Sequence, residues 1–334
     1  MTKIVTSVAA MQLVERGLIG LDDDVGQHVP YLADVQVLTG FDDSGGAVLE
    51  RRTQPITLRK LLTHTAGFAY DATAPQLQQW SRVTNRPASQ AYTLDALKTP
   101  LVFQPGSSWT YGTSLDWAGQ VVEAVSGLPL EEYMRRHIFG PLGMDSATFF
   151  SAAGARPDLA EVDDHYNPHI PAPAPPAPLT GQVAEIAYGG SGLFASANDY
   201  GKLIGAIVAQ DPRILSAETL ATMFSPQLDD ATLLQGFCEI PLISPMPDAT
   251  GPGYAHPVPV NHSLCGAVAM EDVPGHKKKG SMTWKGMTNS HWWVDPVLGI
   301  GGTLYVQVLP YGTKAVVDLS KELETEVYSL WGPK

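Results

Sequence analysis

The sequence predicts an α+β fold in which helices pack on an antiparallel sheet. Apolar residues recur at helical spacing over much of the chain, and short strand-like segments separated by Gly and Asn turns follow near its end. Helices first and a meander of strands late are typical of this layered arrangement. We expect residues 1–334 to form one domain, with a helical lobe over about 55–225 and sheet strands with a closing helix over 262–331.

The first predicted helix spans residues 3–16. Ile4, Val8 and Met11 recur on one face, and Gly17 follows the helix as a C′ glycine commonly does. Apolar residues occupy the positions of the buried face from the first turn of this helix, and no capping residue precedes that turn. We therefore expect further sequence upstream of this helix.

The next segments predict loops and one short helix. Gly40, Asp42–Asp43 and Gly45–Gly46 mark a loop-rich stretch, and Leu58–Leu62 has the pattern of a short helix.

A longer helix is predicted to begin after Thr113. Thr113 and Asp116 resemble a capping box, and the helix is expected to run to Val125 and to end at Gly127. Two further helices are expected over 130–138 and 199–208, the second with Asn198 as its N-cap.

The end of the chain predicts the sheet. Strands are expected over 281–283, 291–295 and 303–309, followed by an amphipathic helix over 319–330. Prolines are dense over 168–178, which predicts a stiff surface loop.

The composition argues against several kinds of partner. The formal net charge is −13 with dispersed carboxylates, which excludes nucleic acid and anionic membranes as expected partners. The basic run Lys277–Lys279 is expected to be a solvent-exposed segment that leads into a strand. The 2 cysteines are too few for a disulfide framework, and no apolar stretch is long enough to cross a membrane. We therefore expect a cytoplasmic protein.

Familiar cofactor and metal motifs are absent from the sequence. It contains no phosphate-binding or dinucleotide-binding glycine loop and no His-Glu-x-x-His, and its 9 histidines lack ligand spacing. Gly189–Gly190 lies in a glycine-rich turn without the strand–helix frame of a phosphate cradle, so we interpret it as structural. No metal and no cofactor are expected.

Three separated segments fit one catalytic scheme, although each residue alone is more often explained by ordinary packing. Lys3 lies on the buried face of the first helix, where desolvation would lower the pKa of its amine and make it a base. Tyr111, just before a helix, could share a proton network with that lysine. In the first strand of the meander, Gly286 lets a ligand approach the strand edge, and the Met287 N–H could donate to an oxyanion.

The same segments carry a family resemblance. They are residues 1–18, residues 37–43, Ile-Thr-Leu-Arg-Lys-Leu-Leu-Thr-His-Thr-Ala-Gly over 56–67, Tyr-Gly-Thr-Ser-Leu-Asp-Trp-Ala-Gly over 111–119, and Lys-Gly-Ser-Met-Thr-Trp-Lys-Gly over 279–286. The chain resembles the serine β-lactamase-like family of class C, penicillin-binding and esterase proteins from Met1 to Trp331. Within that family the likeness is greatest to the fungal lovastatin-type side-chain acyltransferases. The resemblance implies a β-lactamase/transpeptidase-like fold.

The resemblance also implies roles for individual residues. Lys3 matches the lysine that partners the nucleophile, and Tyr111 matches the tyrosine that relays a proton. Thr113 stands where asparagine is usual, and Trp284 replaces the cation that grips a β-lactam carboxylate. These two departures favour neutral esters or thioesters over β-lactams. The His-Thr-Ala-Gly signature that begins at His64 is interpreted as structural, with His64 holding a helix end.

The family motif Ser-x-x-Lys places its nucleophilic serine three residues before the lysine. Here that position falls directly before Met1, and the family's N-terminal helix and first strands would precede it too. Two explanations are open: a start assigned at an internal methionine, or a relative without the nucleophile. Without that serine no acyl-enzyme is expected.

The resemblance therefore implies an acyltransferase of secondary metabolism. It would move an acyl group from a thioester donor, possibly held by a carrier-protein domain, to a small-molecule alcohol through a seryl ester. Met287 N–H and the serine N–H would form the oxyanion hole. Two alternatives stay open: a carboxylesterase of the same architecture and a non-catalytic binding protein. Tyr254, Trp292, Trp293 and the loop 168–178 are candidates for the border of an acceptor pocket, although packing explains the two tryptophans equally well.

Overall fold

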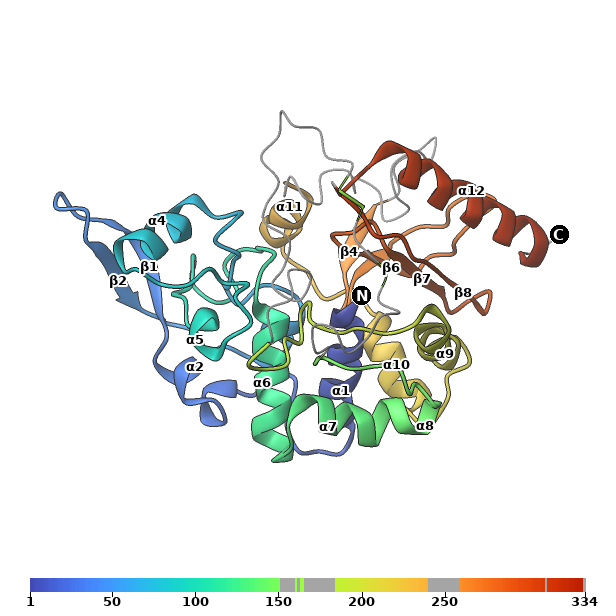
Figure 1. The fold of residues 1–334 in the computed structure, drawn as a ribbon, viewed down its shortest axis with the longest axis horizontal. Helices are drawn as coiled ribbons and strands as arrows, with labels where there is room; N and C mark the ends of the chain where they lie inside the picture. Colours follow the sequence, from blue (N-terminus) through green and yellow to red (C-terminus); the bar gives the residue numbers. More distant parts are fainter. Residues whose placement is uncertain (151–159, 161–162, 165–183, 240–258, 310, 333–334) are drawn as a thin grey trace.

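A five-stranded antiparallel sheet forms one side of the molecule (Figure 1). The structure, a computed structural model, describes residues 1–150, 160, 163–164, 184–239, 259–309 and 311–332. In the sheet the strands follow one another in chain order: β4 (Val260–His262), β5 (Ala267–Ala269), β6 (Met282–Lys285), β7 (His291–Asp295) and β8 (Ile300–Leu304). Helices pack against this sheet, so the predicted α+β fold is confirmed.

Helices cover both faces of the sheet. On one face Trp293 packs with Tyr328 of α12 (Lys314–Trp331), the closing helix. On the other face, a Cβ built at Gly301 would lie 2.6 Å from Val208 of α9 (Ala197–Val208), so this helix lies directly on β8. Trp292, on the same face as α9, belongs to the main core. Packing therefore accounts for both adjacent tryptophans.

Helix α1 (Thr2–Glu15) runs through the centre of the molecule (Figure 1). All residues from Thr2 to Leu13 are buried, which explains why the helix is apolar on every side. The helix ends where the sequence predicts, because Gly17 adopts a left-handed φ of 67°.

The remaining α-helices are α2 Pro30–Asp34, α3 Leu58–Leu62, α4 Pro75–Val83, α5 Leu94–Leu97, α6 Ser114–Ser126, α7 Leu130–Met134, α8 Gly140–Leu142, α10 Ala217–Phe224 and α11 Ala231–Glu239. Of these, α6, α7 and α10 contact α1. A π-helical turn, Arg135–Phe139, joins α7 to α8, so the predicted helix over 130–138 is part of a longer, irregular one. Gly127 ends α6 with a φ of 70°, as predicted.

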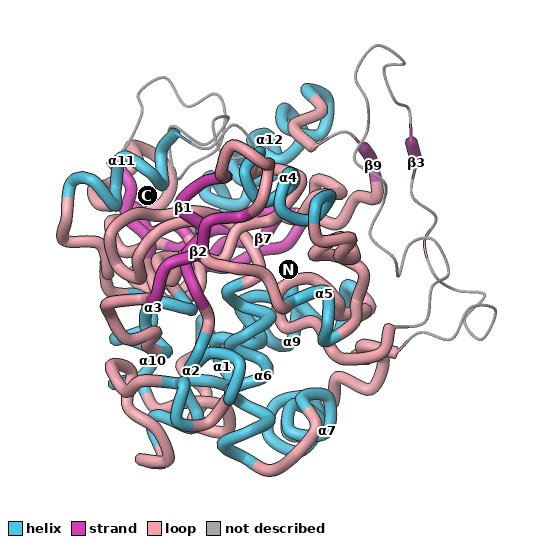
Figure 2. Tube along the Cα trace, turned by 90° about the vertical axis from the view of Figure 1, so that its left-hand side faces the viewer, coloured by secondary structure: helices cyan, strands magenta, loops and turns pink. Residues whose placement is uncertain are grey.

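The loop-rich stretch after residue 35 contains a β-hairpin that the sequence did not predict. Strand β1 (Gln36–Phe41) pairs antiparallel with β2 (Ala47–Arg51), and the hairpin lies on the side of the molecule that faces the viewer in Figure 2. The Asp42 carboxylate accepts the N–H groups of Ser44 and Gly46 at 2.9 Å. The turn residues were recognised correctly, but they close a hairpin between two short strands.

Several predicted boundaries were wrong. Ser196, not Asn198, caps α9, because its hydroxyl accepts the N–H of Asp199. The predicted strand over 303–309 divides into the end of β8 and a separate β9 (Val308–Leu309), which pairs in parallel with β3 (Asp163–Asp164). Helix α12 begins at Lys314, five residues before the predicted start. The loop 168–178 and Tyr254 lie outside the described residues.

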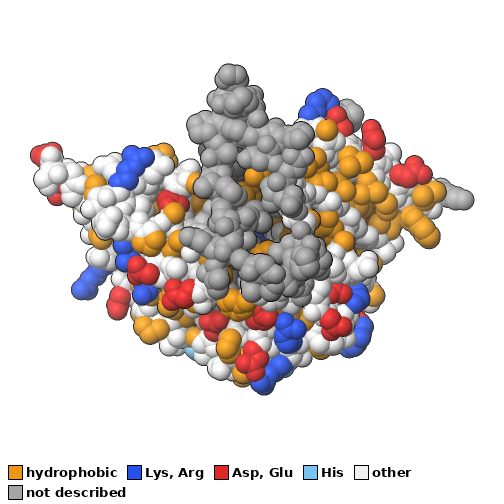
Figure 3. All heavy atoms as spheres, viewed as in Figure 1, with side chains coloured by type: hydrophobic (Ala, Val, Ile, Leu, Met, Phe, Trp, Pro, Cys, Tyr) orange, Lys and Arg blue, Asp and Glu red, His pale blue; other side chains and the backbone are white. Residues whose placement is uncertain are grey.

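The prediction that Lys277 is solvated was also wrong. Its side chain is 3% exposed and forms an ion pair of 2.9 Å with Glu324 of α12. Lys278 pairs with Asp272 at 2.8 Å. Lys277 therefore fastens α12 to the segment that leads into β6. Figure 3 shows apolar side chains gathered at this end of the molecule, where Trp331 is 74% exposed.

Candidate active site

Lys3 is held inside the molecule by a backbone carbonyl. The residue is 6% exposed, and its Nζ donates a hydrogen bond of 2.8 Å to Gly190 O. One turn along α1, the Thr6 hydroxyl donates to Gly189 O at 2.7 Å. Two side chains three residues apart lie on the same face of a helix, so α1 is fixed to the 189–190 turn at two points.

Tyr111 lies directly beside this lysine. The Lys3 ammonium is 4.6 Å from the centre of the Tyr111 ring, within the range of a cation–π interaction. The Tyr111 hydroxyl lies 3.5 Å from Nε1 of Trp284, which donates to it. Residues from α1, from the segment before α6 and from β6 thus meet at one place.

The end of β6 also lies against the start of α1. A Cβ built at Gly286 would be 3.6 Å from the Met1 Cγ, so the backbone that follows β6 lies beside the first residue of the chain, two positions before Lys3. The Gly286 N–H donates to Ser290 O at 2.7 Å. The Met287 N–H has no hydrogen-bond acceptor among the residues that the structure describes. Of these two amides, Met287 is therefore the one available to a ligand.

Thr113 does not form the predicted capping box. It precedes α6 with φ −81° and ψ 12°, not the extended backbone of an N-cap, and its side chain accepts no capping hydrogen bond. The residue is fully buried, and within the described part of the chain its Oγ1 has no partner. The Asp116 carboxylate, the other half of the predicted box, instead accepts the Gly190 N–H at 2.8 Å.

Aromatic rings surround the lysine–tyrosine pair. The Tyr111 ring centre lies 4.8 Å from that of His64, 5.6 Å from that of Tyr70 and 5.7 Å from that of Trp284. The His262 ring centre lies 5.6 Å from that of Trp284. Burial lowers the pKa of His262 to about 4 and that of His64 well below its usual value, with the Lys3 charge adding to the second shift. Both imidazoles are therefore neutral at pH 7.

His64 does more than hold a helix end. Its backbone N–H donates to Leu61 O at 3.3 Å, as expected of that role, but its carbonyl accepts the Thr110 N–H at 3.1 Å. Its φ of 61° is in the left-handed region, which is uncommon outside glycine. This backbone conformation places the residue against the segment that carries Tyr111.

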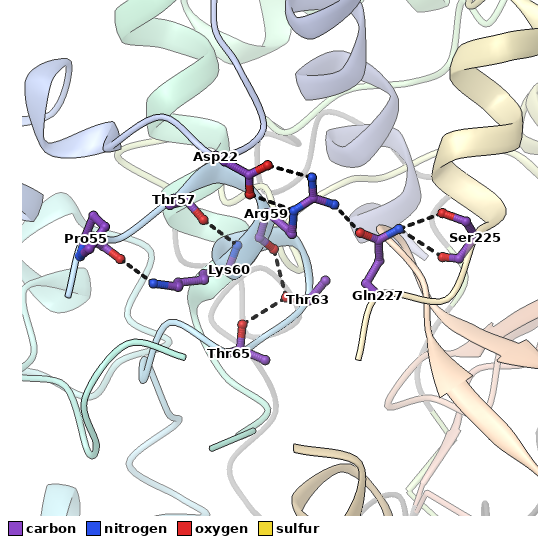
Figure 4. A network of polar contacts seen from close by, with 9 residues as sticks. All are labelled: Asp22, Pro55, Thr57, Arg59, Lys60, Thr63, Thr65, Ser225 and Gln227. Carbon is purple, nitrogen blue, oxygen red and sulfur yellow. Dashed lines mark hydrogen bonds and ion pairs between the residues drawn. The ribbon is translucent and has the colours of Figure 1, made fainter. Parts of the chain in front are cut away.

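A polar network fixes the helix that leads into His64 (Figure 4). Arg59 of α3 pairs with Asp22 at 2.7 Å and donates to Gln227. After the helix, the Thr63 hydroxyl donates to Arg59 O at 2.8 Å and lies 3.0 Å from the Thr65 hydroxyl. The network joins α3 to segments far away in the chain and sets the position of His64.

A small internal space adjoins Lys3. Its total empty volume is about 170 Å³, but no part of it is wide enough to hold a water molecule. The residues that line it are Lys3, Leu62, His64, Leu115, His262, Cys265 and Trp284. Burial raises the pKa of the Cys265 thiol to about 12, so this cysteine is not an activated nucleophile.

The sequence analysis missed the role of Asp116. Burial raises the pKa of its carboxyl to about 6, and the charge of Lys3 opposes that shift. Asp116 had been assigned to a helix cap and Gly190 to a structural turn. The adjacent glycines were the available signal, because a Cβ built at Gly190 would lie 2.6 Å from Asp116 Oδ2.

The described residues contain no group of three or more His, Cys, Asp or Glu side chains arranged to hold a metal ion. None of the described helices combines the length and apolar composition that crossing a membrane requires.

A buried lysine thus lies beside a tyrosine and the end of β6, the central strand of the sheet. The chain belongs to the Beta-lactamase family, which it matches over residues 1–325. It is 33% identical over 338 residues to ML-236A carboxylate methylbutanoyltransferase from Penicillium citrinum, covering 98% of this chain and 79% of the relative. It is 33% identical over 336 residues to lovastatin esterase from Penicillium rubens, covering 98% of this chain and 83% of that protein. The structure of unliganded simvastatin synthase from Aspergillus terreus superimposes with a TM-score of 0.86 at 31% identity, covering 100% of this chain and 83% of that one.

Proposed function

We propose that this protein is an acyltransferase that moves an acyl group from a thioester to a small-molecule alcohol. The observation that carries the proposal is that Lys3, Tyr111 and the end of β6 lie together, and that the Met287 N–H, which follows β6, has no acceptor among the described residues. A base, a proton relay and an oxyanion donor are the groups that acyl transfer requires. The similarity to a methylbutanoyltransferase supports the same reaction.

In this proposal the nucleophile is a serine at the position directly before Met1, which lies outside the 334 residues. Its Oγ bonds to the thioester carbonyl carbon, and its proton passes through Lys3 and Tyr111 to the departing sulfur. The oxygen of the acceptor alcohol then bonds to the same carbon, the bond from that carbon to the serine Oγ breaks, and the alcohol proton returns to this Oγ. The Met287 N–H stabilises the negative charge on the carbonyl oxygen in both steps.

The substrates are neutral at the reacting end. Trp284 occupies the position of the family's carboxylate-gripping cation, and Thr113 the position of an asparagine. Trp284 is 4% exposed and its indole donates to Tyr111, so it offers no charge to an acid. A carrier-protein domain as the acyl donor is the finer part of this proposal.

Hydrolysis is the second candidate function. The similarity to lovastatin esterase favours it, and the same residues would serve with water in place of the alcohol.

The ratio of products distinguishes the two functions. We would prepare the 334-residue chain and the same chain extended by one serine directly before Met1, and supply a short-chain acyl thioester with and without an alcohol. Ester formation by the extended chain, abolished by Lys3→Ala, is the expected result. Exclusive hydrolysis with every alcohol tested would rule out the transferase and leave the esterase. Turnover that survives Lys3→Ala would contradict the assigned base.

A further inference from the structure

One backbone residue connects the candidate base to a buried carboxylate. Asp116 Oδ1 accepts the Gly190 N–H at 2.8 Å, and the Gly190 carbonyl accepts from Lys3 Nζ at 2.8 Å. Asp116 is 1% exposed. The acid of α6 and the amine of α1 are thus joined through the two hydrogen-bonding groups of a single glycine.

Lys3 is the charged group that acts on this carboxylate. Tyr70, Tyr92 and Tyr188 also face it, and burial together with the Asp116 charge raises the pKa of each phenol, so all three are neutral. The Tyr188 hydroxyl donates to Thr93 O at 2.9 Å, away from Asp116. Asp116 Oδ2 has no hydrogen-bond partner in the described part of the chain.

A carboxylate buried in this way is costly unless another charge compensates it. The charge of Lys3 supplies that compensation, because it lowers the pKa of the Asp116 carboxyl against the effect of burial.

The two glycines of the turn are required by this arrangement. A Cβ at Gly190 would lie 2.6 Å from Asp116 Oδ2, and one at Gly189 would lie 2.6 Å from Leu115 O. Contacts this short do not occur for real Cβ atoms, so no side chain fits at either position. The close approach lets the turn lie between α1 and α6.

We propose that Asp116 is a positioning residue for Lys3, which it holds over the Tyr111 ring through the backbone of Gly190. The carboxylate orients the Gly190 residue, and the aligned carbonyl fixes the ammonium. The catalytic meaning of this inference rests on the proposed function, in which Lys3 is the base. Its structural content does not, because it concerns only where the amine is held.

Labelling of Lys3 tests the inference without any turnover. The 334-residue chain is treated with a small amine-acetylating ester, and peptide mass spectrometry compares Lys3 with Lys314, which is 87% exposed. In Asp116→Leu, Lys3 should react about tenfold faster than in the wild type, the change that loss of a charge-assisted hydrogen bond predicts. Asp116→Asn retains an oxygen that can accept the Gly190 N–H, so it should show a smaller increase.

Asp295→Asn is the matched control. Asp295 is 0% exposed and accepts hydrogen bonds from the Lys278 N–H and the Tyr328 hydroxyl, on the α12 side of the sheet. Its replacement disturbs a buried carboxylate without touching Gly190, so Lys3 should react as in the wild type. Wild-type reactivity of Lys3 in a folded Asp116 variant would overturn the inference, as would an equal increase in Asp295→Asn.

A second measurement covers the case in which Asp116→Leu does not fold. Carbon-13 NMR of labelled aspartate carboxyls, assigned with Asp116→Asn, follows the titration of Asp116 in the wild type and in Lys3→Met. The Asp116 midpoint should rise when Lys3 is removed, because the lysine charge lowers it. An unchanged midpoint would show that the two groups are not coupled. If the proposed function alone were wrong, both results would stand and only the turnover assay would fail.

Discussion

The ammonium of Lys3 lies 4.6 Å from the centre of the Tyr111 ring, although 107 residues lie between the two in the chain. The contact exists because α1 is buried in the core and the segment before α6 is held by the His64 carbonyl. The geometry brings an amine, a phenol and the end of β6 together. Their catalytic roles are the part that the following experiments test.

Removing the hydroxyl of Tyr111 should lower the rate of acyl transfer but leave the stability of the fold nearly unchanged. Tyr111→Phe keeps the ring that faces Lys3 but loses the oxygen that Trp284 contacts at 3.5 Å. In the serine-extended chain we expect acyl transfer to fall by about 10²-fold, the contribution typical of a positioned proton donor, with little change in the urea midpoint. Tyr133→Phe, which removes another hydroxyl far from the site, is the control. Equal activity of the two variants would contradict the assigned role.

Gly190→Ala should be strongly destabilising. The added methyl would lie 2.6 Å from the Asp116 carboxylate, and we expect a loss of about 2 kcal/mol in the free energy of unfolding, as overpacking usually costs. In Gly201→Ala the new methyl meets no atom within 4 Å, and a mid-helix alanine should stabilise by about 0.5–1 kcal/mol. Urea unfolding measures both. Equal stability of the two variants would show that the turn can move.

Asp116 should make stability depend on pH. Its pKa is raised from 3.8 to about 6, so between these values the folded chain binds a proton that the unfolded chain has released. This contribution is fully present below pH 3.8 and is lost as the pH rises through about 6. Relative to Asp116→Asn, the wild type should lose about 2 kcal/mol between pH 4 and pH 7. Urea unfolding at several pH values gives the difference, and parallel curves would disprove the shift.

The buried ion pair beneath α12 should be sensitive to the loss of one partner. Lys277 and Glu324 are 3% and 8% exposed, so Lys277→Met leaves an uncompensated buried carboxylate and should cost about 3–5 kcal/mol. The double variant Lys277→Met/Glu324→Leu should recover most of this loss. Lys314→Met, which breaks an exposed pair with Asp318, should leave the urea midpoint unchanged. This account would be contradicted if Lys277→Met were as stable as the double variant Lys277→Met/Glu324→Leu.

The sequence predicted the elements whose signals are local. The periodicity of Ile4, Val8 and Met11 and the glycines at 17 and 127 gave α1 and the end of α6 correctly. The β1–β2 hairpin was missed because its strands are short and partly exposed, so glycine and aspartate dominate the local pattern. Lys277 was misjudged because only tertiary structure brings Glu324 to it.

In the candidate site, too, only the residues with a local sequence signal were predicted. Lys3 and Tyr111 were found because motif spacing marks them, whereas Asp116 was assigned to a cap that fits its local sequence equally well. Its partner, the Gly190 N–H, is 74 positions away in the chain, and only the fold brings the two together. Long-range hydrogen bonds of buried polar side chains leave no periodic trace in a sequence.

Intact-mass spectrometry of the serine-extended chain mixed with an acyl thioester tests the central claim most directly. The account predicts a mass increase equal to one acyl group, located on the added serine, lost in Lys3→Ala and discharged when an alcohol is added. An extended chain that stays unacylated while folded, or that carries the acyl group equally in Lys3→Ala, would contradict it.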